Sequence, residues 1–133
     1  MLVLGISDGM DRLHETEFAR YNKDLHDGAA VLLEDGRVVA AIEEERLDRI
    51  KHSNKFPARA IRFCLEKCGV RLSDIDRIAM VNREETVTRY AAWLHFTLRQ
   101  DSELRDGRQW VQHQLEAELG ETFDTDRMTF VPH

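Results

Sequence analysis

The chain has 133 residues, of which 42% are hydrophobic and 33% are charged, and its net charge is −6 at pH 7. This length suits one compact domain, and the composition argues against intrinsic disorder. The acidic charge argues against non-specific nucleic-acid binding, and no apolar run approaches the roughly 18 residues of a membrane-spanning helix. Residues 1–6 also lack the basic start of a secretory signal. We therefore expect a cytoplasmic protein that binds neither nucleic acid nor membrane.

The first third of the chain predicts three strands. Residues 2–6 form a nearly continuous apolar run, which is typical of a strand covered on both faces. A long polar segment follows, and then come the apolar runs 29–33 and 38–42. The pair Asp35-Gly36 lies between these two runs and predicts a hairpin, because such a turn needs positive φ.

A helix is predicted between Pro57 and Gly69, since proline favours the first turn of a helix and glycine its end. Its apolar stripe comprises Ile61, Cys64, Leu65 and Cys68. The two cysteines have no further ligands at zinc-binding spacing, and a disulfide within one helical turn has poor geometry. We expect both to pack in the core as small apolar side chains.

The rest of the chain alternates between strands and helices. Residues 77–81 and 128–131 read as strands, and residues 86–100 and 109–119 read as helices separated by Asp106-Gly107. This order predicts an α/β fold with a mixed sheet and flanking helices. The aromatic residues Tyr90, Trp93 and Phe96 have helical spacing, so core packing is favoured over a stacking platform for a ligand.

Three clusters could carry chemistry. His26-Asp27 precedes a buried strand, where a histidine can move a proton and an aspartate can set its tautomer. Arg49, Lys51 and His52 form a cationic segment suited to phosphate or carboxylate groups. His133 ends the chain. From composition alone, an ordinary surface loop is the favoured interpretation of the first two clusters, and His133 is compatible with a frayed tail.

Several segments together resemble the N-terminus of the carbamoyltransferase family, which includes nodulation enzymes and enzymes that carbamoylate cephamycin, aminoglycosides and ansamycins. The resemblance is dense over residues 1–81, and it returns at residues 130–133, which resemble the start of the family's Val-x-His-His-x-x-His segment. The matching segments include His26-Asp27-Gly28-Ala29-Ala30, Glu43-Glu44-Glu45-Arg46-Leu47, Arg49-Ile50-Lys51-His52 and Phe56-Pro57-Ala58-Arg59-Ala60-Ile61.

The resemblance implies that residues 1–133 are the N-terminal part of an actin-like (ribonuclease H-like) carbamoyl-transfer domain. The remainder of that domain and a C-terminal adenylating domain would lie outside this chain. The adenylating domain would make carbamoyl-adenylate from carbamoyl phosphate and ATP, and the actin-like domain would pass the carbamoyl group to a small-molecule acceptor. The fragment alone is then expected to be inactive, with an apolar patch where the missing portion docks or the chain self-associates.

The resemblance also assigns site residues. His26 matches the family's active-site histidine, and Asp27 beside it is expected to bind substrate or nucleotide. Lys51 matches a lysine expected to bind the phosphates of the nucleotide or of carbamoyl phosphate, with Arg49 beside it. His133 matches the first ligand of a divalent, iron-type metal, whose site would need further ligands.

Two alternatives stay open from the sequence. The opening strands and Asp8-Gly9 also suit an actin-like sugar kinase or ATPase, although the threonine that usually follows this pair is missing. The second alternative is a non-catalytic interaction module that has kept only the sheet.

Overall fold

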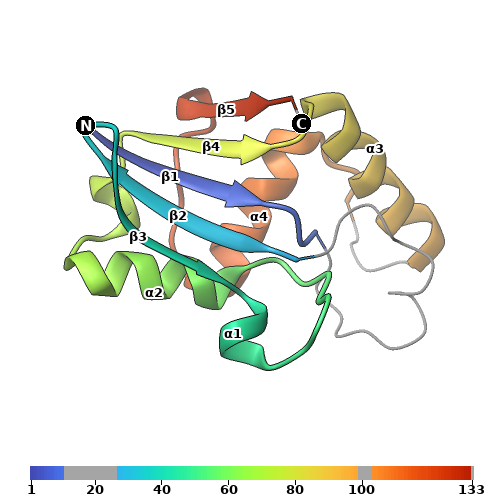
Figure 1. Ribbon diagram of the computed structural model, residues 1–133. Helices are drawn as coiled ribbons and strands as arrows, with labels where there is room; N and C mark the ends of the chain where they lie inside the picture. The colour runs from blue at the N-terminus through green and yellow to red at the C-terminus, as the bar shows by residue number, and fades with distance from the viewer. Residues whose placement is uncertain (11–26, 99–102, 133) are drawn as a thin grey trace.

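In the part of the chain that the structure describes, one mixed sheet has five strands in the order β3-β2-β1-β4-β5 (Figure 1). The computed structural model describes residues 1–10, 27–98 and 103–132. β1 is antiparallel to β2 and parallel to β4, β2 is antiparallel to β3, and β4 is parallel to β5. The strands are β1 Leu2–Ser7, β2 Ala29–Glu34, β3 Arg37–Glu43, β4 Arg77–Val81 and β5 Met128–Val131. The predicted α/β class with a mixed sheet is confirmed.

The predicted hairpin joins β2 to β3. Its turn residues Asp35 and Gly36 have φ values of 48° and 79°, as a tight two-residue turn requires. The strands pair from Ala29 with Glu43 to Glu34 with Arg37, with one irregularity after Leu32. The Asp35 carboxylate also accepts a hydrogen bond of 2.6 Å from the amino group of Met1.

Helices fill the connection between β3 and β4 and the connection between β4 and β5. α2 begins after Pro57 and ends at Gly69, whose φ of 66° gives the left-handed helix end expected of glycine. α4 begins at Gly107, because the Asp106 carboxylate accepts a hydrogen bond of 2.8 Å from the Gln109 N–H. The helical segments are α1 Glu45–Asp48, α2 Ala58–Cys68, η1 Leu72–Asp74, α3 Glu84–Trp93, the π-helical η2 Leu94–Leu98, α4 Gly107–Leu119 and η3 Thr125–Arg127.

Several boundaries differ from the sequence-based expectation. Asp106-Gly107 was read as a break before a helix at residue 109, but Asp106 caps the helix and Gly107 is its first residue. The helix predicted from residue 86 begins at Glu84 and passes into the π-helical segment after Trp93. The short helix α1 was not predicted. The two shifted boundaries lie at helix starts, where capping contacts decide the first residue.

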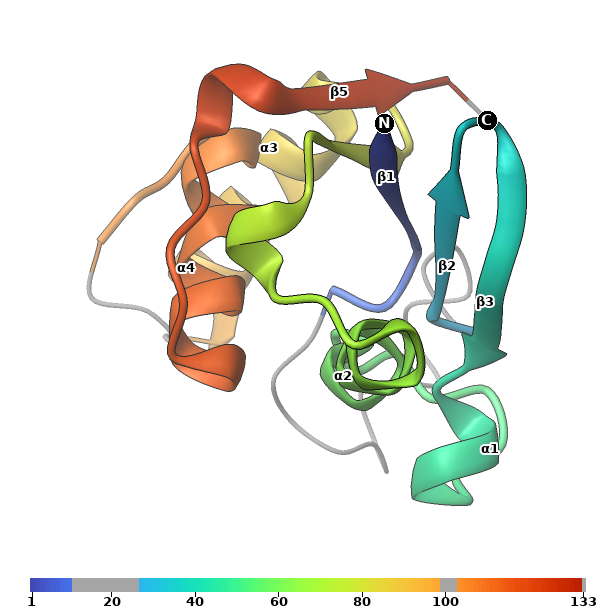
Figure 2. The ribbon, with the colours of Figure 1, turned by 90° about the vertical axis from the view of Figure 1, so that its left-hand side faces the viewer.

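The core lies between the sheet and α2, α3 and α4, which all cover the same face (Figure 2). Inward-facing strand residues pack there against the apolar stripe of α2 and against the aromatic and aliphatic side chains of α4. Its fully buried members include Leu4, Ile6, Leu32, Ile61, Cys64, Ile78, Met80, Val111 and Leu115.

Two expectations about side-chain burial are confirmed in part. Cys64 is buried, and Cys68 packs against the core at its margin. Tyr90 and Trp93 also pack against the core, with their rings 5.5 Å apart. The prediction for Phe96 is wrong, because this side chain is 70% exposed.

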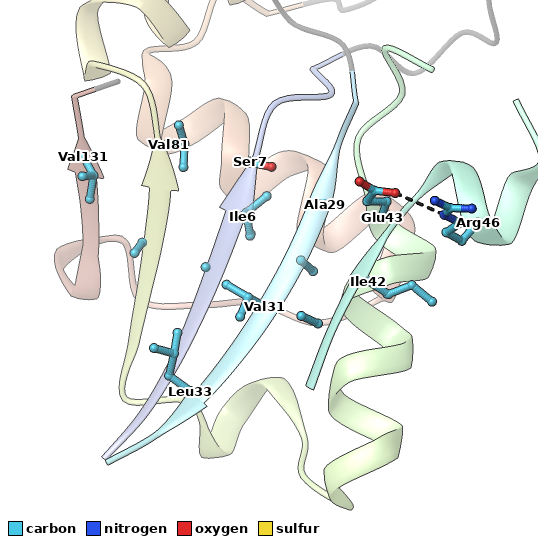
Figure 3. A pocket seen from close by; sticks show the side chains of 14 residues that line it. Ile6, Ser7, Ala29, Val31, Leu33, Ile42, Glu43, Arg46, Val81 and Val131 are labelled. Carbon is cyan, nitrogen blue, oxygen red and sulfur yellow. Dashed lines mark hydrogen bonds and ion pairs between the residues drawn. The ribbon is translucent and has the colours of Figure 1, made fainter. Parts of the chain in front are cut away.

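The opposite face of the sheet is apolar and open among the described residues (Figure 3). Small side chains occupy its centre, and an ion pair of 3.2 Å between Glu43 and Arg46 marks one end. β1 was expected to be covered on both faces, but the described part of the chain covers only one. The face is lined by Gly5, Ser7, Ala29, Val31, Leu33, Ala41, Ala79, Val81 and Val131, together with that ion pair.

A buried carboxylate joins the sheet to α2. The Glu44 side chain is fully buried and accepts hydrogen bonds from the N–H groups of Ala60 at 2.8 Å and Arg59 at 3.4 Å, in the first turn of α2. The Glu44 N–H in turn donates to the Gly28 carbonyl at 2.8 Å. N–H groups at a helix start lack helical partners and carry partial positive charge, so they offset part of the cost of burying this carboxylate.

None of the helices within the described ranges is long and apolar enough to cross a membrane.

Replacing Glu44 tests this connection. We expect Glu44→Ala to lower the free energy of unfolding by about 2–3 kcal/mol, because it leaves buried N–H groups without an acceptor. Glu44→Gln keeps one acceptor oxygen and should cost less. Urea unfolding of the two variants measures the difference, and equal losses would contradict the role of the carboxylate.

The same residue predicts a pH effect. Burial raises the pKa of the Glu44 carboxyl above its ordinary 4.5, although the N–H groups of Ala60 and Arg59 oppose this rise. The folded state therefore binds the proton more tightly than the unfolded chain does. Wild-type stability should fall relative to Glu44→Gln as the pH rises from about 4.5 through the raised pKa. Parallel stability curves between about pH 4 and pH 7 would contradict this.

Candidate functional site

The polar end of the sheet lies where β1 and β4 finish and β2 begins (Figure 1). Asp8 directly follows β1, and Asn82 directly follows the parallel neighbour β4. The Asn82 side-chain amide donates a hydrogen bond of 3.3 Å to the Asp8 carboxylate. Ligands of open α/β sheets bind outside the carboxyl ends of the strands, so this end is the candidate site.

Left-handed backbone is concentrated around this end. Outside glycine such values are uncommon, and they persist where the surrounding structure enforces them. The non-glycine residues concerned are Asp8 (φ 44°), Asp27 (φ 66°), Arg49 (φ 64°), His52 (φ 58°) and Asn82 (φ 104°). We infer that contacts between loops hold these residues in their left-handed conformation.

Asp27 joins the start of β2 to the loop formed by residues 49–55. Its carboxylate Oδ1 lies 3.0 Å from Nδ1 of His52, and its backbone N–H donates to the Ser53 carbonyl at 3.0 Å. Asp27 was predicted to contact substrate or nucleotide, and that role stays a prediction. In the structure, the Asp27 carboxylate contacts His52 of the cationic segment.

Two glycines let the same loop pack closely against the sheet end. A Cβ on Gly9 would lie 2.2 Å from the Lys55 carbonyl oxygen, and one on Gly28 would lie 3.2 Å from the same atom. Ser53 and Asn54 are buried beside this approach. The second half of the loop is therefore fixed by close packing.

The cationic residues lie in the first half of the loop. Arg49 ends α1, and its N–H donates to the Glu45 carbonyl at 3.0 Å. Lys51 is exposed and directly precedes His52. Both side chains thus belong to a segment that is joined to Asp27.

The two other predicted site residues, His26 and His133, lie outside the described residues. Whether His26 and Lys51 share one cleft stays a prediction. Within the described ranges no three histidine, cysteine or acidic side chains are grouped to hold a metal ion.

Cys64 offers no alternative reactive site. The Cys64 thiol lies in the core, 3.6 Å from the Ala30 carbonyl. Burial raises its pKa to about 11, so it stays protonated at neutral pH. This agrees with its expected role as a core side chain.

Comparison with known proteins identifies the family. The sequence model described as "Carbamoyltransferase N-terminus" matches residues 21–118. The chain belongs to the carbamoyltransferase family. It is 45% identical to the nodulation protein NolNO of Sinorhizobium fredii over 133 residues, which are the whole of this chain and 20% of that protein.

Two further relatives are uncharacterised proteins. The first is a 19.2 kDa protein in the syrM 5′ region of Rhizobium etli, which is 57% identical over 79 residues, or 59% of this chain and 46% of that protein. The second is sll1178 of Synechocystis, which is 37% identical over 95 residues, or 68% of this chain and 15% of that protein. The chain thus spans less than half of each of these three relatives.

Four of the segments that resemble the carbamoyltransferase family meet at one place in the fold. The His-Asp segment contacts the cationic loop through Asp27 and His52, and the position of a Cβ on Gly28 lies 3.3 Å from Pro57 at the start of α2. Glu44, from the acidic segment, binds the first turn of the same helix. These separated segments therefore form one structural unit.

Sequence reasoning missed three residues of this unit. Asn82 carried a signal, because a polar residue directly after a parallel strand lies at the ligand-binding edge. His52 was noted only as part of the cationic segment, and Glu44 only as part of an acidic run. Their partners are distant in sequence, so no periodic pattern could reveal these contacts.

The close approach at Gly9 gives a prediction with a matched control. Gly9 and Gly69 have φ values of 64° and 66°, but a Cβ on Gly69 would meet nothing within 4 Å. We expect Gly69→Ala to lower the free energy of unfolding by about 1–2 kcal/mol through its backbone alone. Gly9→Ala should lower it by a further amount of about 1–3 kcal/mol, because the Lys55 carbonyl must move. Equal losses in urea unfolding would contradict the close packing of the loop.

Proposed function

We propose that the full-length protein is an O-carbamoyltransferase, which transfers a carbamoyl group from carbamoyl-adenylate to an acceptor hydroxyl in natural-product or nodulation-factor biosynthesis. Family membership and the similarity to a nodulation protein support this proposal. Carbamoyl phosphate and ATP would supply the carbamoyl-adenylate. Because the chain spans a fifth of NolNO, the adenylating step would belong to another part of the protein.

The proposal includes an actin-like (ribonuclease H-like) type of fold. Its support is the strand order β3-β2-β1-β4-β5, in which β2 is the antiparallel member beside the central strand. The carboxyl ends of β1 and β4 would then face the nucleotide side of the site, where Asp8 and Asn82 lie.

One observation carries the proposed site: the contact between Asp27 and His52. It brings the chain next to His26 close to the chain next to Lys51. The acceptor oxygen would attack the carbamoyl carbon, forming a C–O bond as the bond to the phosphate oxygen breaks and AMP leaves. His26 would accept the hydroxyl proton, and Lys51 would bind the phosphates.

The open face of the sheet would dock a further portion of the same protein. Half-exposed Val31, Leu33 and Val81 line an apolar surface beside the small residues at its centre. Small residues at the centre of a sheet face allow close approach of a packed element, and large open apolar faces mark interaction sites. The relatives are long enough to provide that element, since this chain covers 20% of NolNO.

The function is tested with the full-length protein. Carbamoyl phosphate, ATP and a panel of hydroxylated acceptors should yield AMP and a carbamoylated product, detected by mass spectrometry. Release of AMP or phosphate without a carbamoylated product from any acceptor would contradict the proposal.

The role of Lys51 is tested by Lys51→Ala. We expect kcat/KM for carbamoyl phosphate to fall on the order of 10- to 100-fold, because a charge-assisted contact to phosphate is lost. Lys67→Ala, on the exposed face of α2, should leave activity unchanged and serves as the control. Wild-type kcat/KM in Lys51→Ala would contradict this role.

Docking of the sheet face is tested by thiol labelling of the full-length protein, with peptide mapping to separate the label from Cys64 and Cys68. Val31→Cys on the open face should react slowly, and Val38→Cys, at a position 64% exposed on β3, should react fast. Protection of Val31→Cys that grows with protein concentration would indicate a second copy instead. Equal labelling rates would contradict a covered face.

A further inference from the structure

The pair formed by Asp27 and His52 has a geometry that the family resemblance does not explain. Nδ1 of His52 lies 3.0 Å from the Asp27 carboxylate, with the two side chains 61% and 42% exposed. An ionised carboxylate only accepts hydrogen bonds, so Nδ1 carries the proton in this contact. Pairs this exposed contribute little to the free energy of folding, so we expect the contact to act by positioning the loop.

The rest of the loop is held at both of its ends. Arg49 is fixed as the end of α1, and the segment from Ser53 to Lys55 packs against Gly9 and Gly28. Residues 50–52 form the intervening tip. The contact of His52 with Asp27 is a side-chain hydrogen bond that joins this tip to the start of β2.

The backbone of the pair is also constrained. His52 and Asp27 both have left-handed φ values, of 58° and 66°. Histidine and aspartate tolerate this region better than most residues, but they need surrounding contacts to hold them there. Because Lys51 directly precedes His52, the contact of His52 with Asp27 also restrains where the Lys51 backbone lies.

We propose that His52 is a positioning residue: its Nδ1–H, held by Asp27, fixes the tip of the loop and so holds Lys51 toward the phosphates of the substrate. This inference rests on the proposed function for the role of Lys51. It assigns no contact between His52 and the substrate.

Two substitutions of His52 separate this role from a direct one. His52→Asn places an amide N–H on Cγ, where Nδ1 is bonded, and asparagine favours left-handed backbone. His52→Gln carries its amide one carbon further out and loses the donor next to Asp27. His113→Gln on α4 applies the same substitution away from the site and is the control.

In the full-length protein we expect His52→Gln to raise KM for carbamoyl phosphate on the order of tenfold, with kcat changed less than about threefold. His52→Asn and His113→Gln should keep KM within about threefold of wild type. If His52→Asn raises KM as much as His52→Gln does, or if neither changes KM, the proposal is overturned.

Amide hydrogen exchange without substrate tests the contact between His52 and Asp27 independently of catalysis. The Asp27 N–H, which donates to Ser53, should exchange faster in His52→Gln and at the wild-type rate in His52→Asn. If the wild-type protein transfers no carbamoyl group, the proposed function fails. The hydrogen-exchange rates alone then show whether His52 holds the loop. Equal exchange in wild type and His52→Gln would overturn it.

Discussion

The burial of the Glu44 carboxylate at the start of α2 is the constraint on which the rest of the structure depends. The sheet and its covering helix are separate in the chain, and they need a contact that fixes both position and direction. Glu44 provides it because its backbone N–H binds Gly28 at the start of β2 while its side chain binds the first turn of α2. A buried charge costs free energy unless hydrogen bonds compensate it, so the carboxylate must stay aligned with the N–H groups of α2. The loop of residues 49–55 is held between these two anchored points.

The candidate site follows from that arrangement. Because α2 begins beside the start of β2, the loop that leads into the helix must pass the end of the sheet where β1 and β4 finish. Gly9 and Gly28 have no side chains, so the loop backbone can lie directly against them. The cationic loop is thereby brought to Asp27, and through it to the segment that precedes β2. A packing requirement in the fold thus determines which polar residues of this carbamoyltransferase segment become neighbours.

The local parts of the fold could be predicted from sequence, and the contacts between distant segments could not. Strands at residues 77–81 and 128–131 were predicted at their observed bounds, and Pro57 and Gly69 delimited α2, because periodicity and helix-end signals are local. Glu44 reaches Ala60, Asp27 reaches His52 and Asn82 reaches Asp8 across loops, where no pattern records the pairing. The apolar run in β1 predicted cover on both faces, since hydrophobicity reports what a strand buries in the whole protein and not which segment covers it. The family resemblance supplied His26, Lys51 and His133 as candidates, and their joint geometry depends on residues outside the described ranges.

The place of β1 in the sheet order has a consequence for folding. Its antiparallel partner β2 follows soon in the chain, whereas its parallel partner β4 comes only after α2, and β5 comes later still. On the ribosome, the β1–β2–β3 meander can therefore form early, with the apolar edge of β1 unpaired until residue 81 has emerged. Pairing between sequence-distant strands is slow because loop closure precedes the gain in contacts. The nascent chain thus passes through a stage in which its central strand is exposed to pairing with another chain.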